Sequence, residues 1–443
     1  MTVNRRTALR LGAALLTAGL AAPLAGRTAD ERFVRRRGTA LMRGAERYRY
    51  AGANMWYAAY LGAAAPTGNR DRLRRELDTL GSLGVRNLRL LASSELSPLT
   101  NSLRPAFRDA GPRYNEALLR GLDVALAEMG RRGMTAVLYL TNFWEWSGGM
   151  MTYLSWVKGG KYINNNDPAH PWPEFADHAS AFYATDAAVK LYHDYVRAVV
   201  GRTNTVTGAR YADDPSIMAW QLANEPRPGG GEAVARVNMP AFDGWVTATA
   251  RLIKSIDPHH LVSTGSEGLM GCNNDEPCVI AEHRVLDVDY LTAHVWPLNW
   301  SWVDDKDLAG TWAAGEAKVR AYLDAHVRLA TQLGKPLVIE EFGFPRDLGY
   351  DPGTATKWKD RFYGLIYDAV IAGTRGDGPV AGSNFWGWGG AGRSTRADHR
   401  FAPGADAYVG DPPHEPQGWY SVFDTDRSTG DVIRHHAAAL ARI

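Results

Sequence analysis

The chain has 443 residues, of which 45% are hydrophobic and 22% are charged, an ordinary composition for a globular protein. Its 50 basic and 48 acidic side chains give a formal net charge of +2, and no long basic block is available to neutralise nucleic-acid phosphates. The composition therefore argues against nucleic acid as a partner and leaves room for a large hydrophobic core.

Residues 1–29 have the features of an export signal. A basic start is followed by an apolar stretch over about residues 9–24 and by small residues. This stretch is short and contains a proline, so it does not suit a membrane-spanning helix. The pair Arg5-Arg6 followed by Thr-Ala-Leu resembles a twin-arginine signal. We therefore expect export to the periplasm or the extracellular space, and removal of the signal would leave a net charge of −2, because it carries four arginines and no acid.

From residue 50 onward, short apolar runs typical of strands alternate with longer stretches of helical periodicity. The helical patterns include residues 70–84, 115–133, 184–202 and 315–334, and several end in glycine, as helix C-termini often do. The shortest expected helix lies within residues 273–286. Eight runs predict strands, at residues 50–56, 85–92, 135–142, 217–224, 261–268, 289–296, 336–343 and 380–388.

Eight alternating strand–helix units in about 390 residues predict a (β/α)8 TIM barrel. An open doubly wound sheet is the alternative, but no G-x-G-x-x-G follows the first strand, and the "PGGG" at 228–231 lacks the lysine of a phosphate-binding loop. No repeat, linker or further stretch of eighteen apolar residues divides the rest of the chain. We expect one catalytic domain over residues 30–443, and a soluble monomer without a membrane partner.

The predicted strands end in polar and aromatic residues, which is where TIM barrels carry their active sites. Packing explains any single tryptophan, but ten of the fifteen lie at or just beyond these ends, where flat rings can stack on sugars. The ten are Trp56, Trp144, Trp146, Trp156, Trp172, Trp296, Trp300, Trp302, Trp386 and Trp388. Other polar strand-end residues are Asn54, Arg89, Asn142, Asn224, Glu225, Glu267, His294, Glu340 and Glu341.

Two carboxylates indicate the reaction. Glu225 lies in the run "WQLANEP" after the fourth strand, and Glu341 lies in "VIEEFG" at the end of the seventh. These strand ends face each other across a barrel mouth, and glycoside hydrolysis needs two carboxylates. A lone acid would suggest a structural salt bridge, whereas both together, among tryptophan, arginine and histidine, predict a glycosidase. The alternative from another class is a barrel that binds carbohydrate without cleaving it.

The two cysteines, Cys272 and Cys278, are separated by five residues, unlike a C-x-x-C metal or redox motif. Export favours a disulfide between them, and two free thiols are the alternative. The histidines form no H-E-x-x-H motif. We therefore expect neither a metal nor a cofactor.

The motifs "ANEP" and "EEFG" resemble those of glycoside hydrolase family 5 in clan A. The segments "TNFWEWSGGMMTYLSW", "RTNTVTGARYADDPSIMAWQLANEPRP", "KSIDPHHLVSTGSEGLMG", "HVWPLNW" and "KPLVIEEFG" are similar to its β-mannanase subfamily 7, and the likeness covers about residues 48–440. It implies a retaining endo-β-1,4-mannanase that hydrolyses β-mannan or manno-oligosaccharides by double displacement. An exo-acting β-mannosidase is the alternative, because residues 157–180 are long enough to wall off one end of a cleft, and a glucan substrate is a weaker one.

The resemblance also implies roles for single residues. Glu225 matches the acid/base and Glu341 the nucleophile. Strand alternation predicts that Glu340 points to the other side of the strand, away from the sugar. The residues expected to bind substrate are Trp56, Arg89 (bonded to the nucleophile), Trp144 and Glu267 (both at the +1 side), Asn224 (at the sugar 2-hydroxyl), His294 (the family histidine), Trp296 (where many relatives have a tyrosine) and Trp386 (under the −1 sugar).

Overall fold

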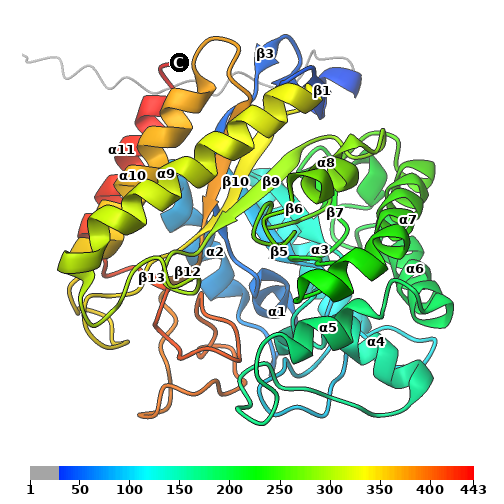
Figure 1. The fold of residues 1–443 in the computed structure, drawn as a ribbon. Helices are drawn as coiled ribbons and strands as arrows, with labels where there is room; N and C mark the ends of the chain where they lie inside the picture. Colours follow the sequence, from blue (N-terminus) through cyan, green and yellow to red (C-terminus); the bar gives the residue numbers. More distant parts are fainter. Residues whose placement is uncertain (1–28) are drawn as a thin grey trace, which may run out of the picture.

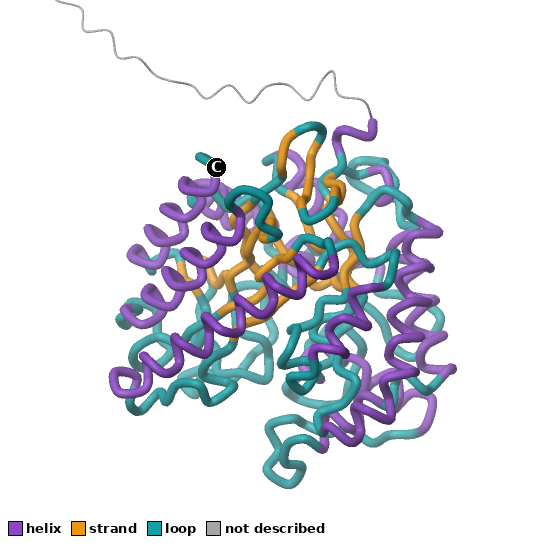
Figure 2. The backbone as a smooth tube through the Cα atoms, turned by 45° about the horizontal axis from the view of Figure 1, so that its top comes forward, coloured by secondary structure: helices purple, strands orange, loops and turns teal. Residues whose placement is uncertain are grey.

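The computed structural model of the protein describes residues 29–443, so residues 1–28 of the expected export signal lie outside the described residues. Helices surround an inner ring of strands, as Figure 2 shows. Within residues 29–443, none of the helices has both the length and the apolar character needed to cross a lipid bilayer.

Eight parallel strands form the barrel, in the order β8-β7-β6-β5-β4-β11-β10-β9. Backbone hydrogen bonds from Asp289 to Val262 (2.7 Å) and from His294 to Glu267 (3.1 Å) join the two ends of this order. The predicted (β/α)8 fold and all eight predicted strands are therefore confirmed. The strands are β4 (Tyr50–Asn54), β5 (Asn87–Leu91), β6 (Thr135–Tyr139), β7 (Ile217–Gln221), β8 (Leu261–Ser263), β9 (Leu291–Val295), β10 (Leu337–Phe342) and β11 (Val380–Phe385).

The outer helices begin and end at local signals in the sequence. Asn69 caps the first long helix by accepting a hydrogen bond from the Arg72 amide at 3.0 Å, and Gly334 ends another in a left-handed conformation with φ 62°. The helices are α1 (Ala58–Gly62), α2 (Arg70–Ser82), α3 (Glu116–Arg131), α6 (Asp186–Val200), α7 (Glu232–Ile256), α8 (Glu276–Arg284), α9 (Leu308–Leu333), α10 (Lys357–Thr374) and α11 (Arg427–Leu440), with short 3-10 turns at η1 (Ala29–Arg32), η2 (Glu145–Ser147) and η3 (Tyr211–Asp213).

A small antiparallel sheet closes the N-terminal end of the barrel. It contains β1 (Val34–Arg37), β2 (Ala40–Arg43) and β3 (Glu46–Arg47). Val34 and Leu41 of this sheet pack in one buried cluster with Tyr50, Val137 and Val338, which come from the barrel strands. The floor of the barrel is therefore filled with apolar side chains.

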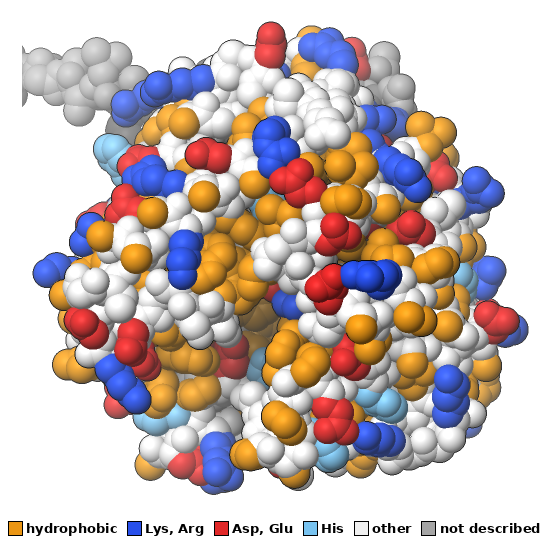
Figure 3. All heavy atoms as spheres, viewed as in Figure 1, with side chains coloured by type: hydrophobic (Ala, Val, Ile, Leu, Met, Phe, Trp, Pro, Cys, Tyr) orange, Lys and Arg blue, Asp and Glu red, His pale blue; other side chains and the backbone are white. Residues whose placement is uncertain are grey.

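That other end carries the long connections. Helices α4 (Gly149–Lys158) and α5 (Glu174–Ser180) follow β6 and lie opposite β1 and β3 in Figure 1. A second long connection, residues 391–421, separates the short strands β12 (Trp388–Gly390) and β13 (Val422–Phe423). In Figure 3, basic and acidic side chains alternate over the visible face, and hydrophobic side chains border a hollow near its centre.

Candidate active site

The two carboxylates predicted to converge lie side by side in the mouth. Glu225 follows β7 and Glu341 belongs to β10, and their side chains are 9% and 3% exposed. A carboxylate oxygen of Glu225 and one of Glu341 lie within 4.8 Å of each other. The expectation that residues 116 positions apart meet across the barrel mouth is therefore confirmed.

The backbone at Glu225 is strained. Its φ of 51° lies in the left-handed region, which residues with a Cβ atom rarely adopt. Its amide donates to the carbonyl of Gly265 at 2.9 Å, which ties this turn to the residues that follow β8. The conformation is thus held by its surroundings rather than by local preference.

Arg89, from β5, lies beneath the carboxylates and is completely buried. Its guanidinium donates to Gln221 Oε1 at 2.7 Å and to Asn224 Oδ1 at 2.7 Å, and forms an ion pair with Glu341. The Asn224 amide in turn donates to Asn142 Oδ1 at 3.1 Å. The expected contact between Arg89 and Glu341 is present, and the arginine also fixes the amide of Asn224.

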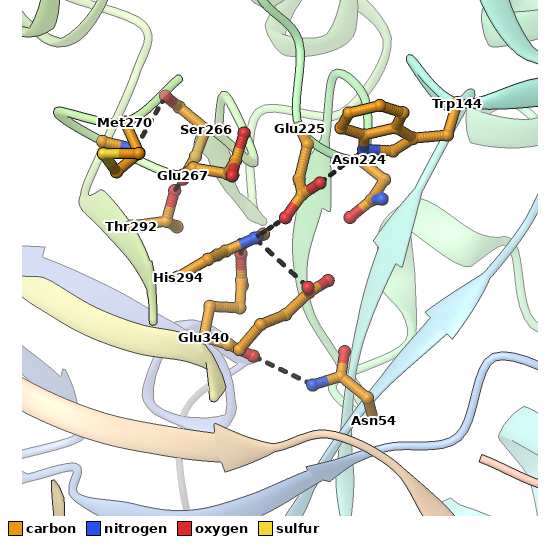
Figure 4. Close-up of polar contacts among 12 residues, drawn as sticks. Asn54, Trp144, Asn224, Glu225, Ser266, Glu267, Met270, Thr292, His294 and Glu340 are labelled. Atoms are coloured by element: carbon orange, nitrogen blue, oxygen red, sulfur yellow. Dashed lines mark hydrogen bonds and ion pairs between the residues drawn. The ribbon is translucent and has the colours of Figure 1, made fainter. Parts of the chain in front are cut away.

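His294, at the end of β9, lies between the two carboxylates. Its Nδ1 is 2.6 Å from Glu225 Oε1 and 3.3 Å from Glu341 Oε2 (Figure 4). Burial alone would lower the pKa of His294, but Glu341, Glu225 and Glu340 raise it well above its ordinary value. Burial raises the pKa of Glu225, yet the hydrogen bond from His294 brings it below its ordinary value. The two opposite shifts of pKa favour the proton on His294 over Glu225.

The side chain of Glu340 does not lie where strand alternation predicted. The prediction that it points to the other side of the strand was wrong. The pairing register of β10 with β9 shifts between Ile339 and Glu341, so a β-bulge lies at Glu340. The bulge turns Glu340 into the barrel interior, beneath His294 in Figure 4. Its Oε2 lies 3.5 Å from Arg89 Nε and 3.8 Å from His294 Nε2.

The tryptophans divide between the mouth and the core. Six of the ten strand-end tryptophans line the mouth, namely Trp144, Trp146, Trp172, Trp296, Trp300 and Trp386, as does Trp419. The indole of Trp144 donates to Glu225 Oε2. Trp296 packs against Tyr420, with ring centroids 5.0 Å apart.

The expectation that Trp56 binds substrate does not agree with the structure. Its side chain is 1% exposed, and its indole donates to the Gly410 carbonyl at 3.0 Å. Helix α1 begins two residues later and turns this position into the core beneath the mouth. Arg89 and His294 are likewise absent from the lining and act from behind the carboxylates.

Polar and aromatic groups from β6, β7 and β8 lie beside Glu225. Arg227, just after the "NEP" motif, lies over the rings of Trp144 (5.5 Å) and Trp172 (5.4 Å). It forms an ion pair with Glu267. Burial raises the pKa of Glu267 to about 7, with Arg227 opposing the shift. Sequence reasoning missed Arg227, although it adjoins the catalytic motif.

Two connections meet across the opposite part of the mouth. The Asn166 side chain, between α4 and α5, donates to the His414 carbonyl at 2.7 Å, and Asn101 donates to Asn164 at 3.1 Å. His414 Nδ1 also lies 3.4 Å from Glu145, whose side chain is fully buried. Burial would lower the pKa of His414, but Glu145 raises it overall. We call the contacting residues 164–166 and 412–416 the wall.

The pocket enclosed by these groups has a volume of about 780 Å³, enough for more than one sugar ring. The wall contributes Asn165, Asn166, Pro412, His414, Glu415 and Pro416 to its lining. Burial raises the pKa of Glu415 to about 8. None of the residues from 391–421 was predicted, because this stretch has no periodicity that points to a site.

Cys272 and Cys278 form a disulfide, as expected, with their Cα atoms 5.8 Å apart. The loop that the disulfide closes carries Asn273 and Asn274, which line the pocket and have positive φ angles of 52° and 61°. The covalent bond therefore stabilises a strained part of the mouth.

Comparison with known proteins agrees with a barrel that carries two carboxylates in its mouth. A family model described as GH family 5 beta-mannosidase-like matches residues 31–443. The chain is similar to putative mannan endo-1,4-beta-mannosidase 9 of Oryza sativa subsp. japonica, with 30% identity over 442 residues that cover 97% of this chain and 93% of the relative.

Solved structures extend the likeness. The glycoside hydrolase family 5 mannosidase from Rhizomucor miehei has a TM-score of 0.84 at 35% identity, covering 93% of this chain and 98% of that chain, and a mutant of it was solved with mannosyl-fructose. The endo-1,4-beta-mannanase from the same organism has a TM-score of 0.66 at 20% identity, covering 93% and 100%, which speaks for the fold alone. The chain therefore belongs to the β-mannosidase-like proteins of glycoside hydrolase family 5, and it is a glycoside hydrolase related to the mannan endo-1,4-β-mannosidases.

Proposed function

We propose that the protein is a retaining, exo-acting β-mannosidase of subfamily 7, which removes single mannose units from the non-reducing ends of manno-oligosaccharides. The wall is the observation that carries this proposal. Residues 164–166 follow β6 and residues 412–416 follow β11, so their contact spans the mouth above β4 and β5, the strands between them.

The wall lies on the side that would hold the non-reducing end. An acid/base protonates the leaving oxygen, so the groups around Glu225 belong to the leaving-group side. Glu267 extends this side toward β8, which stands opposite β4 in the strand order. A chain of sugars can therefore extend past Glu267 but is stopped by the wall after the sugar on Trp386.

The proposed reaction is a double displacement. Glu341 attacks the anomeric carbon while Glu225 protonates the leaving sugar, and Glu225 then deprotonates the water that releases mannose. The separation of the two carboxylates, within 4.8 Å, supports retention of configuration. Retaining enzymes place these groups about 5–5.5 Å apart, whereas inverting enzymes leave room for a water between them.

A second candidate is the endo-acting mannanase predicted from the sequence. The pocket volume of about 780 Å³ and the endo-acting name of the rice relative favour it. The two candidates differ in the early products of mannohexaose. We expect mannose alone at first, with little loss of viscosity in a mannan solution. Early mannobiose and mannotriose would instead establish internal cleavage.

Substrate class and stereochemistry are tested separately. Aryl β-mannoside should be hydrolysed much faster than aryl β-glucoside, and NMR of the first-formed sugar should detect the β-anomer. Initial α-mannose would contradict the nucleophile role of Glu341, whatever the product length.

We also propose that residues 1–29 direct export, by the twin-arginine route, and that the mature protein is a monomer. The basic start, the apolar stretch and the Arg5-Arg6 pair support the export. Replacing both arginines with lysine should keep the protein in the cytoplasm, and sedimentation should give a mass near that of one mature chain.

A further inference from the structure

Glu340 is a third carboxylate in the site, and neither step of the proposed reaction uses it. Its side chain is completely buried. One oxygen accepts a hydrogen bond from Gln221, and among residues 29–443 the other oxygen has no hydrogen-bond partner. Burying a carboxylate is costly, so a residue needed only for packing would be neutral. The bulge in β10 is what brings this charge inside.

The charge lies next to the ring that joins the two reacting carboxylates. Nε2 of His294 is 3.8 Å from Glu340 Oε2, a distance for an ion pair rather than a hydrogen bond. On the other side of the ring, Nδ1 is 2.6 Å from Glu225. The three residues form a line of carboxylate, imidazole and carboxylate that leads from the barrel interior to the mouth.

We propose that Glu340 is a positioning residue that holds His294 with Nε2 toward the barrel interior, so that the Nδ1 proton stands ready for Glu225. This inference rests on the proposed function. Although no hydrogen bond forms at 3.8 Å, the negative charge of Glu340 attracts the hydrogen on Nε2 and favours the ring orientation that directs this nitrogen toward the barrel interior. If Nε2 of the His294 imidazolium keeps its hydrogen, the proton on Nδ1 is the one that can move to Glu225.

The proton balance of the reaction fits this arrangement. The hydrogen bond from His294 lowers the pKa of Glu225, yet Glu225 must protonate the leaving oxygen. The proton moves from Nδ1 of His294 to Oε1 of Glu225 and then to the leaving sugar, which leaves a neutral imidazole with hydrogen on Nε2. In the second step Glu225 removes a proton from water, and this proton returns to Nδ1.

Several charged groups act on His294, and their signs give the effect of changing Glu340. Negative charges from Glu225, Glu341, Glu340 and Glu267 favour the imidazolium. Arg89 and Arg227 are paired with these same acids, and His326 of α9 adds a titratable group nearby. Removing the charge of Glu340 leaves Arg89 less compensated, so the pKa of His294 must fall.

The test is the variant Glu340→Gln, with Glu340→Asp as the variant that retains the charge. NMR of the imidazole nitrogens, assigned by their loss in His294→Gln, should give a His294 pKa lower by about one unit or more in Glu340→Gln. The alkaline limb of kcat/KM on an aryl β-mannoside should move to lower pH by the same amount. Glu340→Asp should keep the wild-type limb even if kcat falls.

Glu282→Gln is the matched control. Glu282 is also fully buried with an unpartnered oxygen among the described residues, but burial already raises its pKa, and it lies on α8 away from His294. Neither the His294 titration nor the pH profile should move in this variant.

The outcomes separate the inference from the proposed function. An unchanged His294 titration in Glu340→Gln, or equal shifts in Glu340→Asp and Glu340→Gln, would overturn the role of Glu340. Because the NMR titration needs no substrate, it remains informative if the wild type fails to cleave mannosides, a result that would count against the proposed function alone.

Discussion

The side-chain amide of Asn166 donates a hydrogen bond to the backbone carbonyl of His414 at 2.7 Å. These residues are 248 positions apart and belong to connections that leave different strands of the barrel. Their contact joins two connections across the part of the mouth above β4 and β5. On the proposed function, this contact determines how many sugars precede the cleaved bond.

Replacing residues 164–170 with two glycines should open the closed end. We expect mannohexaose then to yield mannobiose and mannotriose among its first products, because sugars can extend beyond Trp386. Hydrolysis of an aryl mannoside should persist. Asn166→Ala is the control, since it loses one hydrogen bond, worth about 1 kcal/mol, and keeps the loop. An unchanged mannose-only pattern in the shortened variant would count against the wall.

Glu225→Ala and Glu341→Ala should each lower kcat by about 10²–10⁴ or more without lowering the melting temperature greatly. Azide should restore activity to both on an activated aryl mannoside, with different products. Glu225→Ala should form β-mannosyl azide from the covalent intermediate, and Glu341→Ala should form α-mannosyl azide directly. The same anomer from both variants would contradict the assigned roles.

The left-handed backbone of Glu225 predicts a difference between two inactive variants. Glycine adopts a φ of 51° without a Cβ clash, whereas alanine does not. The free energy of unfolding of Glu225→Gly should therefore be about 1 kcal/mol higher than that of Glu225→Ala. Urea denaturation measures this, and equal stabilities would mean that the turn relaxes when the carboxylate is removed.

The ion pair between His414 and Glu145 makes the wall sensitive to pH. Because the folded-state pKa of His414 is raised, its charge stabilises the wall fully below its ordinary value, and this stabilisation is lost as pH rises through the raised value. Hydrogen exchange of the Asn165 amide, which donates to Glu145 Oε1 at 3.3 Å, should accelerate beyond its intrinsic rate as pH rises. In His414→Gln, the exchange rate of this amide should rise with pH only as fast as the intrinsic rate does. If the additional acceleration persists in this variant, His414 is not its source.

Breaking the disulfide with Cys272→Ser and Cys278→Ser should destabilise the protein by about 2 kcal/mol, the value expected for a short closed loop. Since Asn273 and Asn274 line the leaving-group side, KM for manno-oligosaccharides should rise. The kcat for an aryl mannoside should change little, because Glu225 and Glu341 lie outside the loop. A fall in kcat with unchanged KM would contradict the expectation that the loop affects substrate binding and not the chemical step.

Periodicity and residue chemistry predicted the eight strands and the meeting of Glu225 with Glu341. Both follow from rules that act over a few residues: alternating elements give the barrel, and strand ends give the mouth. The disulfide was predicted on a different ground, the expected export of the protein to a compartment where disulfides form. The predicted contact of Arg89 with Glu341 depended on the family resemblance.

Features that depend on distant parts of the chain were missed. Strand alternation assigns Glu340 to the wrong face, because a bulge depends on how β10 pairs with β9. Trp56 follows a strand directly, yet helix α1 draws it into the core. Residues 157–180 were expected to wall off one end of a cleft, but their contact with residues 412–416 was not predicted, because nothing local in either segment points to the other.

On the proposed function, the wall leaves the pocket with one opening for both entry and exit. Mannose formed on Trp386 must leave past Arg227 and Glu267, along the path that the departing sugar took. A second oligosaccharide bound between Trp144 and Trp172 would block that path while mannose is still inside. Turnover should therefore pass through a maximum and decline as the oligosaccharide concentration increases, whereas an enzyme open at both ends would reach a plateau.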